Sequence, residues 1–150
     1  MKIKAYRNGS SEEISKLEKN FKIKLPEDYK NFLIQYNGGN VDDGYLYVKE
    51  LDEYMLMGYF FGIGIERGFA DIIKINEEFN DDIPNKSLLI GTDEGEGFLL
   101  LVNDGISNGI WYYDHIYFFE KSTDDLNTYF ICETFSDFIK MLETTEVRNE

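Results

Sequence analysis

Cysteine and histidine are almost absent from this sequence, which excludes most catalytic and metal-binding arrangements. The 150 residues include one cysteine, Cys132, and one histidine, His115. A single cysteine cannot form a disulfide within the chain, so the sequence fits a reducing compartment, and we expect the cytoplasm. A zinc site made of cysteine and histidine needs about four ligands, and two such residues are too few.

Proline is scarce as well, and long apolar runs are missing. The two prolines and the lack of repeated or compositionally simple stretches leave no candidate linker, so we expect one domain over residues 1–150, with 143–150 as a frayed tail. No apolar run approaches the roughly 18 residues that span a bilayer. The basic start, Met1–Arg7, is not followed by an apolar segment, which argues against a signal peptide.

Basic residues are the third kind of residue that the sequence has in low number. Lys and Arg number 15 against 29 Asp and Glu, which gives a net charge of −14. This balance argues against binding to DNA or RNA and against docking on an anionic membrane. A basic protein partner is compatible with it, although solubility alone also explains an acidic domain. Residues 1–40 carry a net +3, so the remaining residues carry −17, which suggests a one-sided electrostatic field.

Hydrophobic residues make up 43% of the chain and aromatics 16%, enough for a sizeable core in one domain. Ser10, with Glu13 three positions later, is a capping-box pattern that predicts a helix over residues 10–20. Pro26 suits the first position of a second helix. That helix has an apolar stripe at helical spacing and ends where glycine permits a left-handed backbone; the residues concerned are Tyr29, Phe32, Leu33, Tyr36, Asn37, Gly38 and Gly39.

The middle of the chain is typical of strands with one embedded helix over residues 70–79. A last helix begins after Thr134, with apolar residues on one face. Strands grouped between helices predict an α+β fold with a largely antiparallel sheet, two N-terminal helices, one embedded helix and a C-terminal helix. The predicted strands cover residues 44–51, 55–65, 87–91, 98–102, 110–113, 116–119 and 129–132.

Few residues fit known catalytic patterns. A reactive Cys132–His115 pair is less plausible than an inert thiol in an apolar strand, and Asp114-His115 lacks a serine in a nucleophile context. The glycines of 62–68 do not have the spacing of a dinucleotide or phosphate loop, because Arg67 stands where a glycine is needed. Glycines at bends of a twisted sheet explain them better.

Carboxylates in the glycine-rich turn at 93–97 leave one enzymatic alternative open. Asp93, Glu94 and Glu96 could hold calcium or a carbohydrate, or act as paired acid and base. They lack EF-hand spacing, however, and acids in such a turn are usually solvated. A carboxylate-based hydrolase is therefore the least favoured reading, and we expect no catalytic residues, no metal and no cofactor.

Four motifs follow one another along the chain. They are Leu25-Pro26-Glu27-Asp28-Tyr29-x-x-Phe32-Leu33 with Asn37-Gly38-Gly39, then Leu89-Ile90-Gly91-Thr92-Asp93-Glu94-Gly95-Glu96-Gly97-Phe98, then Tyr112-Tyr113-Asp114-His115, then Thr134-Phe135-Ser136-Asp137-Phe138. Together they resemble the SUKH superfamily, the Smi/Knr-type domain named partly for yeast cell-wall regulators. The resemblance covers essentially the whole chain. Two departures are Glu96-Gly97, where many relatives have Gly-Asp, and the aromatic segment 59–62, which matches loosely.

The resemblance implies an α+β domain and an immunity role, in which the protein binds and neutralises a bacterial toxin, often a nuclease. The alternative is a regulatory or scaffold module, as the yeast members are. A basic toxin domain would meet an acidic face, and the aromatic residues 59–61 are the second choice of contact surface. The acids predicted to contact the partner are those expected in turns: Asp42, Asp43, Asp93, Glu94, Glu96 and Asp104.

Overall fold

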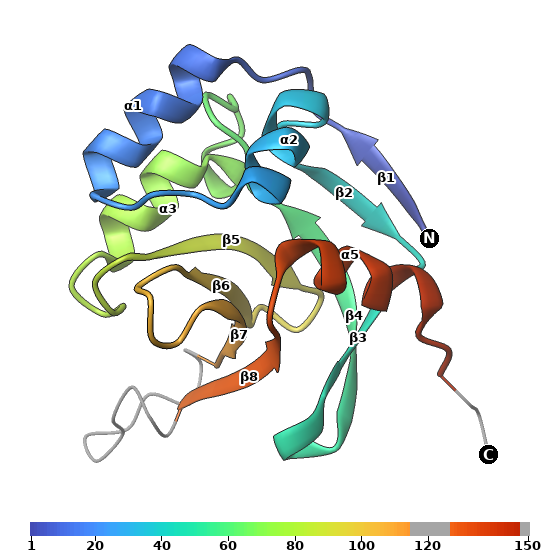
Figure 1. Ribbon diagram of the computed structural model, residues 1–150. Coiled ribbons are helices and arrows are strands. Elements are labelled where there is room, and N and C mark those ends of the chain that lie inside the picture. The colour runs from blue at the N-terminus through green and yellow to red at the C-terminus, as the bar shows by residue number, and fades with distance from the viewer. Residues whose placement is uncertain (115–126, 148–150) are drawn as a thin grey trace.

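The computed structural model describes residues 1–114 and 127–147 and has the predicted α+β architecture (Figure 1). The α-helices in the described part of the chain are α1 (Ser11–Phe21), α2 (Glu27–Gln35), α3 (Ile72–Phe79) and α5 (Phe135–Thr144), and two short 3-10 helices are η1 (Lys49–Leu51) and η2 (Gly68–Ala70). The strands are β1 (Lys2–Ala5), β2 (Gly39–Asp42), β3 (Tyr45–Val48), β4 (Glu53–Phe60), β5 (Ser87–Asp93), β6 (Phe98–Val102), β7 (Gly109–Tyr113) and β8 (Thr128–Cys132). His115 and the strand predicted at 116–119 lie outside the described residues.

All strand pairings in the sheet are antiparallel, as predicted. Its order is β1-β2-β4-β5-β6-β7-β8, and β3 pairs with β4. Strands β2 and β3 pair with different parts of β4, since β2 meets Tyr59 and Phe60 whereas β3 meets 53–56. Between β2 and β3 the chain turns at Asp43, whose φ is 57°. Strand β1 was not predicted from the sequence.

The helix ends follow local chemistry that the sequence displays. The side chain of Ser10 accepts a hydrogen bond from Glu13 N (3.2 Å), and Thr134 does the same for Asp137 N (3.0 Å), so both predicted N-caps are confirmed. Pro26 caps α2 from one position before the helix instead of occupying its first turn. The Glu13 carboxylate pairs with Arg7 (2.6 Å), which ties the start of α1 to the segment after β1.

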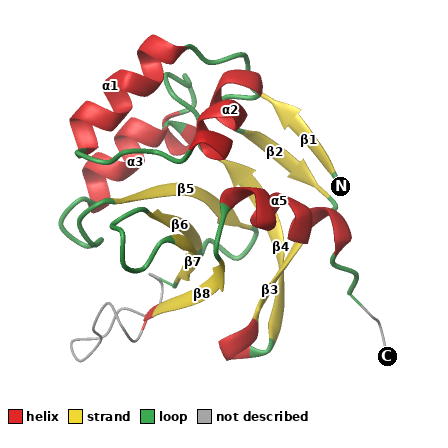
Figure 2. Ribbon diagram, in the orientation of Figure 1, coloured by secondary structure: helices red, strands yellow, loops and turns green. Residues whose placement is uncertain are grey.

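Helices α2 and α5 lie side by side and cover one face of the sheet (Figure 2). The contact is aromatic: Phe32 lies 4.9 Å from both Phe60 and Phe135, measured between ring centroids. Phe138 also meets Phe60 edge to face, at 6.1 Å. Such aromatic pairs contribute about 0.5–1.5 kcal/mol each beyond the area that they bury. The apolar faces predicted for both helices are therefore the ones that form the core.

Asn76 attaches α3 to the sheet through its buried side-chain amide. Its Nδ2 donates to the carbonyl oxygens of Ile72 (2.8 Å) and Leu89 (3.0 Å), and its Oδ1 accepts from Leu89 N (2.8 Å). Each polar atom of the amide thus has a partner, as a buried amide requires. The helix is fixed in register against β5, the strand that leads to the acidic turn at 93–97.

Candidate partner-binding face

One face of the sheet around β1, β2 and β4 is left uncovered by α2 and α5. In the antiparallel register, Lys4 lies opposite Asn40, and Asn40 opposite Tyr59. Directly opposed residues point to the same side of a sheet, and so do residues two apart in a strand. Phe60 points to the helices, so Tyr59 and its cross-strand neighbours point the other way. We call this the open face; its sheet residues are Lys2, Lys4, Asn40, Asp42 and Tyr59, with the first four exposed and Tyr59 half-buried.

A loop that follows β4 borders the open face and is held by Asn37. The buried Asn37 side chain accepts from Ile63 N (2.9 Å) and donates to Ile63 O (3.0 Å). Arg7 Nη2 donates to the same carbonyl at 2.6 Å. Asn37 has a φ of 47°, a left-handed conformation that asparagine tolerates better than most residues. The prediction that Asn37 helps to end a helix therefore gave only part of its role, since its amide also anchors the 61–69 loop.

The loop brings an exposed aromatic ring, Phe69, against Tyr59. The two ring centroids are 5.7 Å apart at an interplanar angle of 77°, and 57% of Phe69 is exposed. Phe60 and Phe61, which the sequence suggested as part of an aromatic surface, are 0% and 1% exposed. That expectation was wrong for both, because Phe60 packs under α2 and α5, while Phe61 packs against Phe98.

The turn between β5 and β6 is organised by Asp93, which is not the exposed turn residue that we predicted. Its Oδ1 accepts from Gly97 N (2.6 Å) and its Oδ2 from Tyr112 Oη (3.0 Å), and the residue is buried. Burial raises the pKa of the Asp93 carboxyl, against the effect of these hydrogen bonds. A Cβ on Gly97 would lie 2.0 Å from Tyr112 Oη, so this close approach requires glycine. The carboxylate shapes the turn and is not available as a surface contact.

Glu94 and Glu96 are the acids that the turn presents to solvent. Thr92 lies opposite Tyr59 in the register of β4 and β5, so the turn begins next to the open face. Burial, with the negative charges of Glu96 and Glu94, raises the pKa of the Tyr59 hydroxyl. Glu94 N also donates to Leu56 O of β4 (2.8 Å), which joins the turn to the strand that carries Tyr59. The structure thus brings together two of the predicted acids and the aromatic pair Tyr59–Phe69.

The other three predicted acids are dispersed. Asp42 is exposed at the end of β2, on the same face as Tyr59, and Asp43 is exposed in the turn that follows. Asp104 lies in the loop between β6 and β7, at the opposite end of the β5–β6 hairpin from the 93–97 turn. Its carboxylate accepts from Ser107 N (2.6 Å) and Ile106 N (2.9 Å), which lowers its pKa. The six acids therefore do not form one continuous face.

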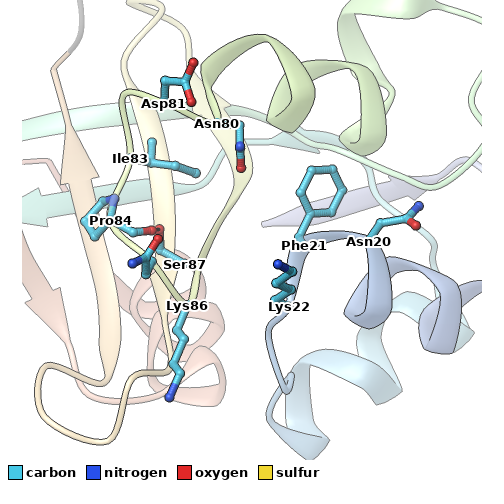
Figure 3. Close-up of a pocket in the computed structure, with 10 residues that line it drawn as sticks. Asn20, Phe21, Lys22, Asn80, Asp81, Ile83, Pro84, Lys86 and Ser87 are labelled. Carbon is cyan, nitrogen blue, oxygen red and sulfur yellow. Dashed lines mark hydrogen bonds between the residues drawn. The ribbon is translucent and has the colours of Figure 1, made fainter.

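Two cavities of the protein differ in where they lie relative to the open face. One, of about 500 Å³, lies at the edge of the open face and is lined partly by Lys4, Tyr6, Asn40 and Arg67. The other, of about 760 Å³, separates the end of α1 from the segment between α3 and β5 (Figure 3). Phe21 and Lys22 form one wall of this second cavity, and the segment that includes Ile83 and Pro84 forms the other. None of the predicted acids lines either cavity.

Two features of the described ranges bear on the metal-binding and cysteine-based alternatives. Within 1–114 and 127–147, no group of three or more His, Cys, Asp and Glu side chains is arranged to hold a metal ion. Burial raises the pKa of the Cys132 thiol to about 12, so this cysteine is protonated at neutral pH and a poor nucleophile. No helix in these ranges combines the length and the apolar character needed to cross a membrane.

Comparison with known families identifies the family of this chain. The sequence model described as the SMI1 / KNR4 family (SUKH-1) matches residues 8–141, from just before α1 to within α5. The chain belongs to this family. No curated protein matches the chain. Membership in the SMI1/KNR4 family supports an immunity-type or Smi/Knr interaction domain, and it confirms the resemblance and fold class inferred from the motifs.

The SMI1/KNR4 motifs of this chain correspond to specific contacts. Asp28 of Leu-Pro-Glu-Asp-Tyr accepts from Tyr29 N in α2 and from Ser136 N in α5. Asn37 of Asn-Gly-Gly holds the 61–69 loop, and Asp93 of the second motif shapes the acidic turn. Asn37 and Asp93 are buried beside the open face, whereas Asp28 joins the two helices on the other side of the sheet.

Proposed function

We propose that this protein is an immunity protein, which binds a toxin domain directly and neutralises it. The observation that carries the proposal is that the acidic turn of Glu94 and Glu96 joins β4, the strand whose Tyr59 contacts the exposed Phe69. Stable interfaces combine an aromatic centre with a polar, charged rim, and aromatic residues there contribute a large share of the binding energy. This part of the open face has that composition.

The rigidity of both elements supports the same function. Asp93 fixes the turn through Gly97 and Tyr112, and Asn37 fixes the loop through Ile63. A surface that is already ordered loses little conformational entropy on binding, so more of its contact energy appears as affinity.

Charge supports a basic partner. The net charge of −14 and the exposed Glu94 and Glu96 would attract a cationic domain, such as a nuclease whose active site is built to hold phosphates. Attraction of this kind raises the association rate more than it slows dissociation. We therefore expect the acidic turn to act mainly on the rate of encounter.

The proposal predicts that a toxin domain is encoded beside this protein's gene, and that domain is the partner for the test. Co-expression of the natural protein should restore growth of cells that produce the toxin, and the purified proteins should bind. Reversing both charges with Glu94→Lys and Glu96→Lys should lower the association rate by about tenfold or more at low salt. The effect should shrink at 1 M salt, where the Debye length falls to about 3 Å.

The matched control is Glu143→Lys with Glu146→Lys. These acids are exposed at the C-terminal end of α5, on the side of the sheet away from Tyr59. The control variant has the same net charge as the test variant. It therefore distinguishes the effect of a direct contact at the 93–97 turn from the effect of the net charge on the association rate. Equal slowing by the two variants would reject the acidic turn as a contact, and a toxin that neither binds nor is neutralised would reject the immunity function.

A further inference from the structure

The cavity of about 500 Å³ at the edge of the open face is rich in cations, in a protein that is otherwise strongly acidic. It lies among the end of β1, the segment that follows it and the 64–67 part of the loop. Its charged lining residues are Lys4, Arg7 and Arg67, with Glu66 as the single acid. The cavity thus has a positive lining, whereas the whole chain carries −14.

Two of these three cations are not neutralised by the protein itself. Arg7 is committed to Glu13 through an ion pair of 2.6 Å and also donates to Ile63 O. Neither Lys4 nor Arg67 has a carboxylate within 4.0 Å in the described part of the chain. Both side chains belong to exposed residues, so an anion entering the cavity can meet them without displacing an internal partner.

Neutral hydrogen-bonding groups converge on the same space. Tyr6 Oη donates to Asn40 Oδ1 at 3.4 Å, and both residues line the cavity. The positive charge of Arg67 acts on the Tyr6 hydroxyl, opposing the rise in its pKa that burial and Tyr59 cause. Arg67, Lys4, Tyr6 and Asn40 line one cavity, which therefore combines a guanidinium, an ammonium, a phenol and an amide.

We propose that this cavity binds the carboxylate of an Asp or Glu side chain of the protein partner. A guanidinium pairs with a carboxylate through two parallel hydrogen bonds, and Lys4 supplies a second charge. The proposal rests on the proposed function and deepens it: the partner presents a basic surface to Glu94 and Glu96 and an acidic side chain to Lys4 and Arg67. Negative charges on one side of Tyr59 and positive charges on the other would then fix the orientation of the partner.

A side-chain carboxylate fits this cavity better than the phosphates of a nucleic acid because it brings less negative charge. A side-chain carboxylate brings one negative charge toward a protein of −14, whereas a nucleic acid brings a closely spaced series of them. At about 0.15 M ionic strength the Debye length is roughly 8 Å, so the nearby cations act on a single bound group more strongly than distant acids do.

The proposal can be tested on the whole protein without the toxin. Backbone amide signals would be followed by NMR during titration with an N-acetylated, C-amidated peptide of one glutamate flanked by glycines, which carries a single carboxylate. The control is the matched peptide with glutamine in place of glutamate. We expect saturable shifts at Lys4, Asn40, Gly64 and Arg67, with a Kd of about 1 mM, and none with the glutamine peptide. Lys4→Glu and Arg67→Glu should each weaken binding about tenfold, as loss of a charge-assisted contact predicts.

The matched control is Lys2→Glu, which changes the same charge on the same face of β1 but does not line the cavity. It should change the peptide Kd less than about twofold. Equal weakening by Lys2→Glu, or no saturable shifts at the cavity, would overturn the proposal. Tighter binding of inorganic phosphate than of the glutamate peptide at the same residues would overturn it in favour of a free anion.

This test is separable from that of the proposed function. If the toxin binds and Glu94→Lys with Glu96→Lys slows association, but the glutamate peptide does not shift the cavity, the immunity proposal stands and the carboxylate subsite fails. If the peptide occupies the cavity but the toxin does not bind, the subsite stands and its assignment to a toxin fails.

Discussion

Asp28 and Ser136, 108 residues apart in sequence, join the N-terminal ends of α2 and α5. Asp28 Oδ2 accepts from both Ser136 N and Ser136 Oγ at 2.9 Å, while Oδ1 accepts from Tyr29 N at 2.8 Å. One carboxylate thus satisfies an unpaired N–H at the start of each helix, where the helix dipoles favour negative charge. The two helices that cover the same face of the sheet are aligned by this residue.

Asp28→Ala should lower the free energy of unfolding by about 1–3 kcal/mol, because it removes hydrogen bonds to two helix starts at once. Urea denaturation at neutral pH measures the change. Glu27→Ala is the control, since Glu27 is exposed and pairs with Lys30 only at 3.7 Å. A stability loss in Asp28→Ala no larger than in Glu27→Ala would show that the link between α2 and α5 contributes little.

Leu33→Ala should lower the free energy of unfolding by about 2–5 kcal/mol, as removal of a large core side chain does. Leu33 is 0% exposed in α2, whereas its neighbour Ile34 is 40% exposed. Ile34→Ala therefore serves as the control in the same helix and should shift the thermal midpoint much less. Equal shifts in the two variants would contradict the burial of the Leu33 face of α2.

Asp93 should make stability depend on pH in a defined direction. Because burial raises its pKa in the folded state, the folded protein binds this proton more tightly than the unfolded chain. The contribution of Asp93 is full below the unfolded pKa of about 3.9 and is lost as the pH rises through the folded value. Asp93→Asn cannot ionise, so it should gain stability relative to the natural protein as the pH rises from about 4 to 7.

Urea denaturation in steps of pH follows this difference. Tyr112→Phe removes a hydrogen bond that favours the ionised Asp93 carboxylate. The free energy of unfolding of this variant should therefore fall more steeply with rising pH than that of the natural protein. A difference between Asp93→Asn and the natural protein that stays flat, or falls with pH, would mean that the hydrogen bonds from Gly97 and Tyr112 outweigh burial.

Phe69→Ala should weaken binding to the toxin domain by about tenfold or more, as expected for an aromatic residue at the centre of an interface. The side chain is 57% exposed, so the thermal midpoint should change little. Ile106→Ala is the control, because Ile106 is 92% exposed in the β6–β7 loop, away from the 93–97 turn. Affinity loss in both variants alike, or in neither, would remove Phe69 from the interface.

The elements that could be predicted are those with local signals. The caps at Ser10 and Thr134 and the apolar strand 98–102 depend on residues a few positions apart, and the structure confirms them. Strand β1 was missed because Lys2–Ala5 has one half-buried apolar side chain, Ile3. Its strand conformation comes from pairing with β2, more than thirty residues away.

The candidate site was less predictable, because tertiary contacts decide which side chains reach the surface. In the sequence, Asp93 resembles Glu94 and Glu96 as an acid in a glycine-rich turn, and only Tyr112, 19 residues later, distinguishes it. Phe69 and Phe61 are both aromatic residues in an apolar segment, yet one is exposed and the other buried. The spacing of residues in the sequence does not predict which of the two rings is exposed, because their exposure depends on how the 61–69 loop is anchored.

The anchoring of that loop has a consequence for how specificity can change. Asn37 and Arg7 bind the loop through the main-chain atoms of Ile63, so their hydrogen bonds do not depend on which side chains the following residues carry. Residues such as Arg67 and Phe69 can therefore be exchanged while the scaffold beneath them keeps its geometry. We therefore expect residues 64–69 to be replaceable as a unit without loss of the fold. Replacing them with the corresponding residues of a relative should transfer the binding specificity of that relative to this protein.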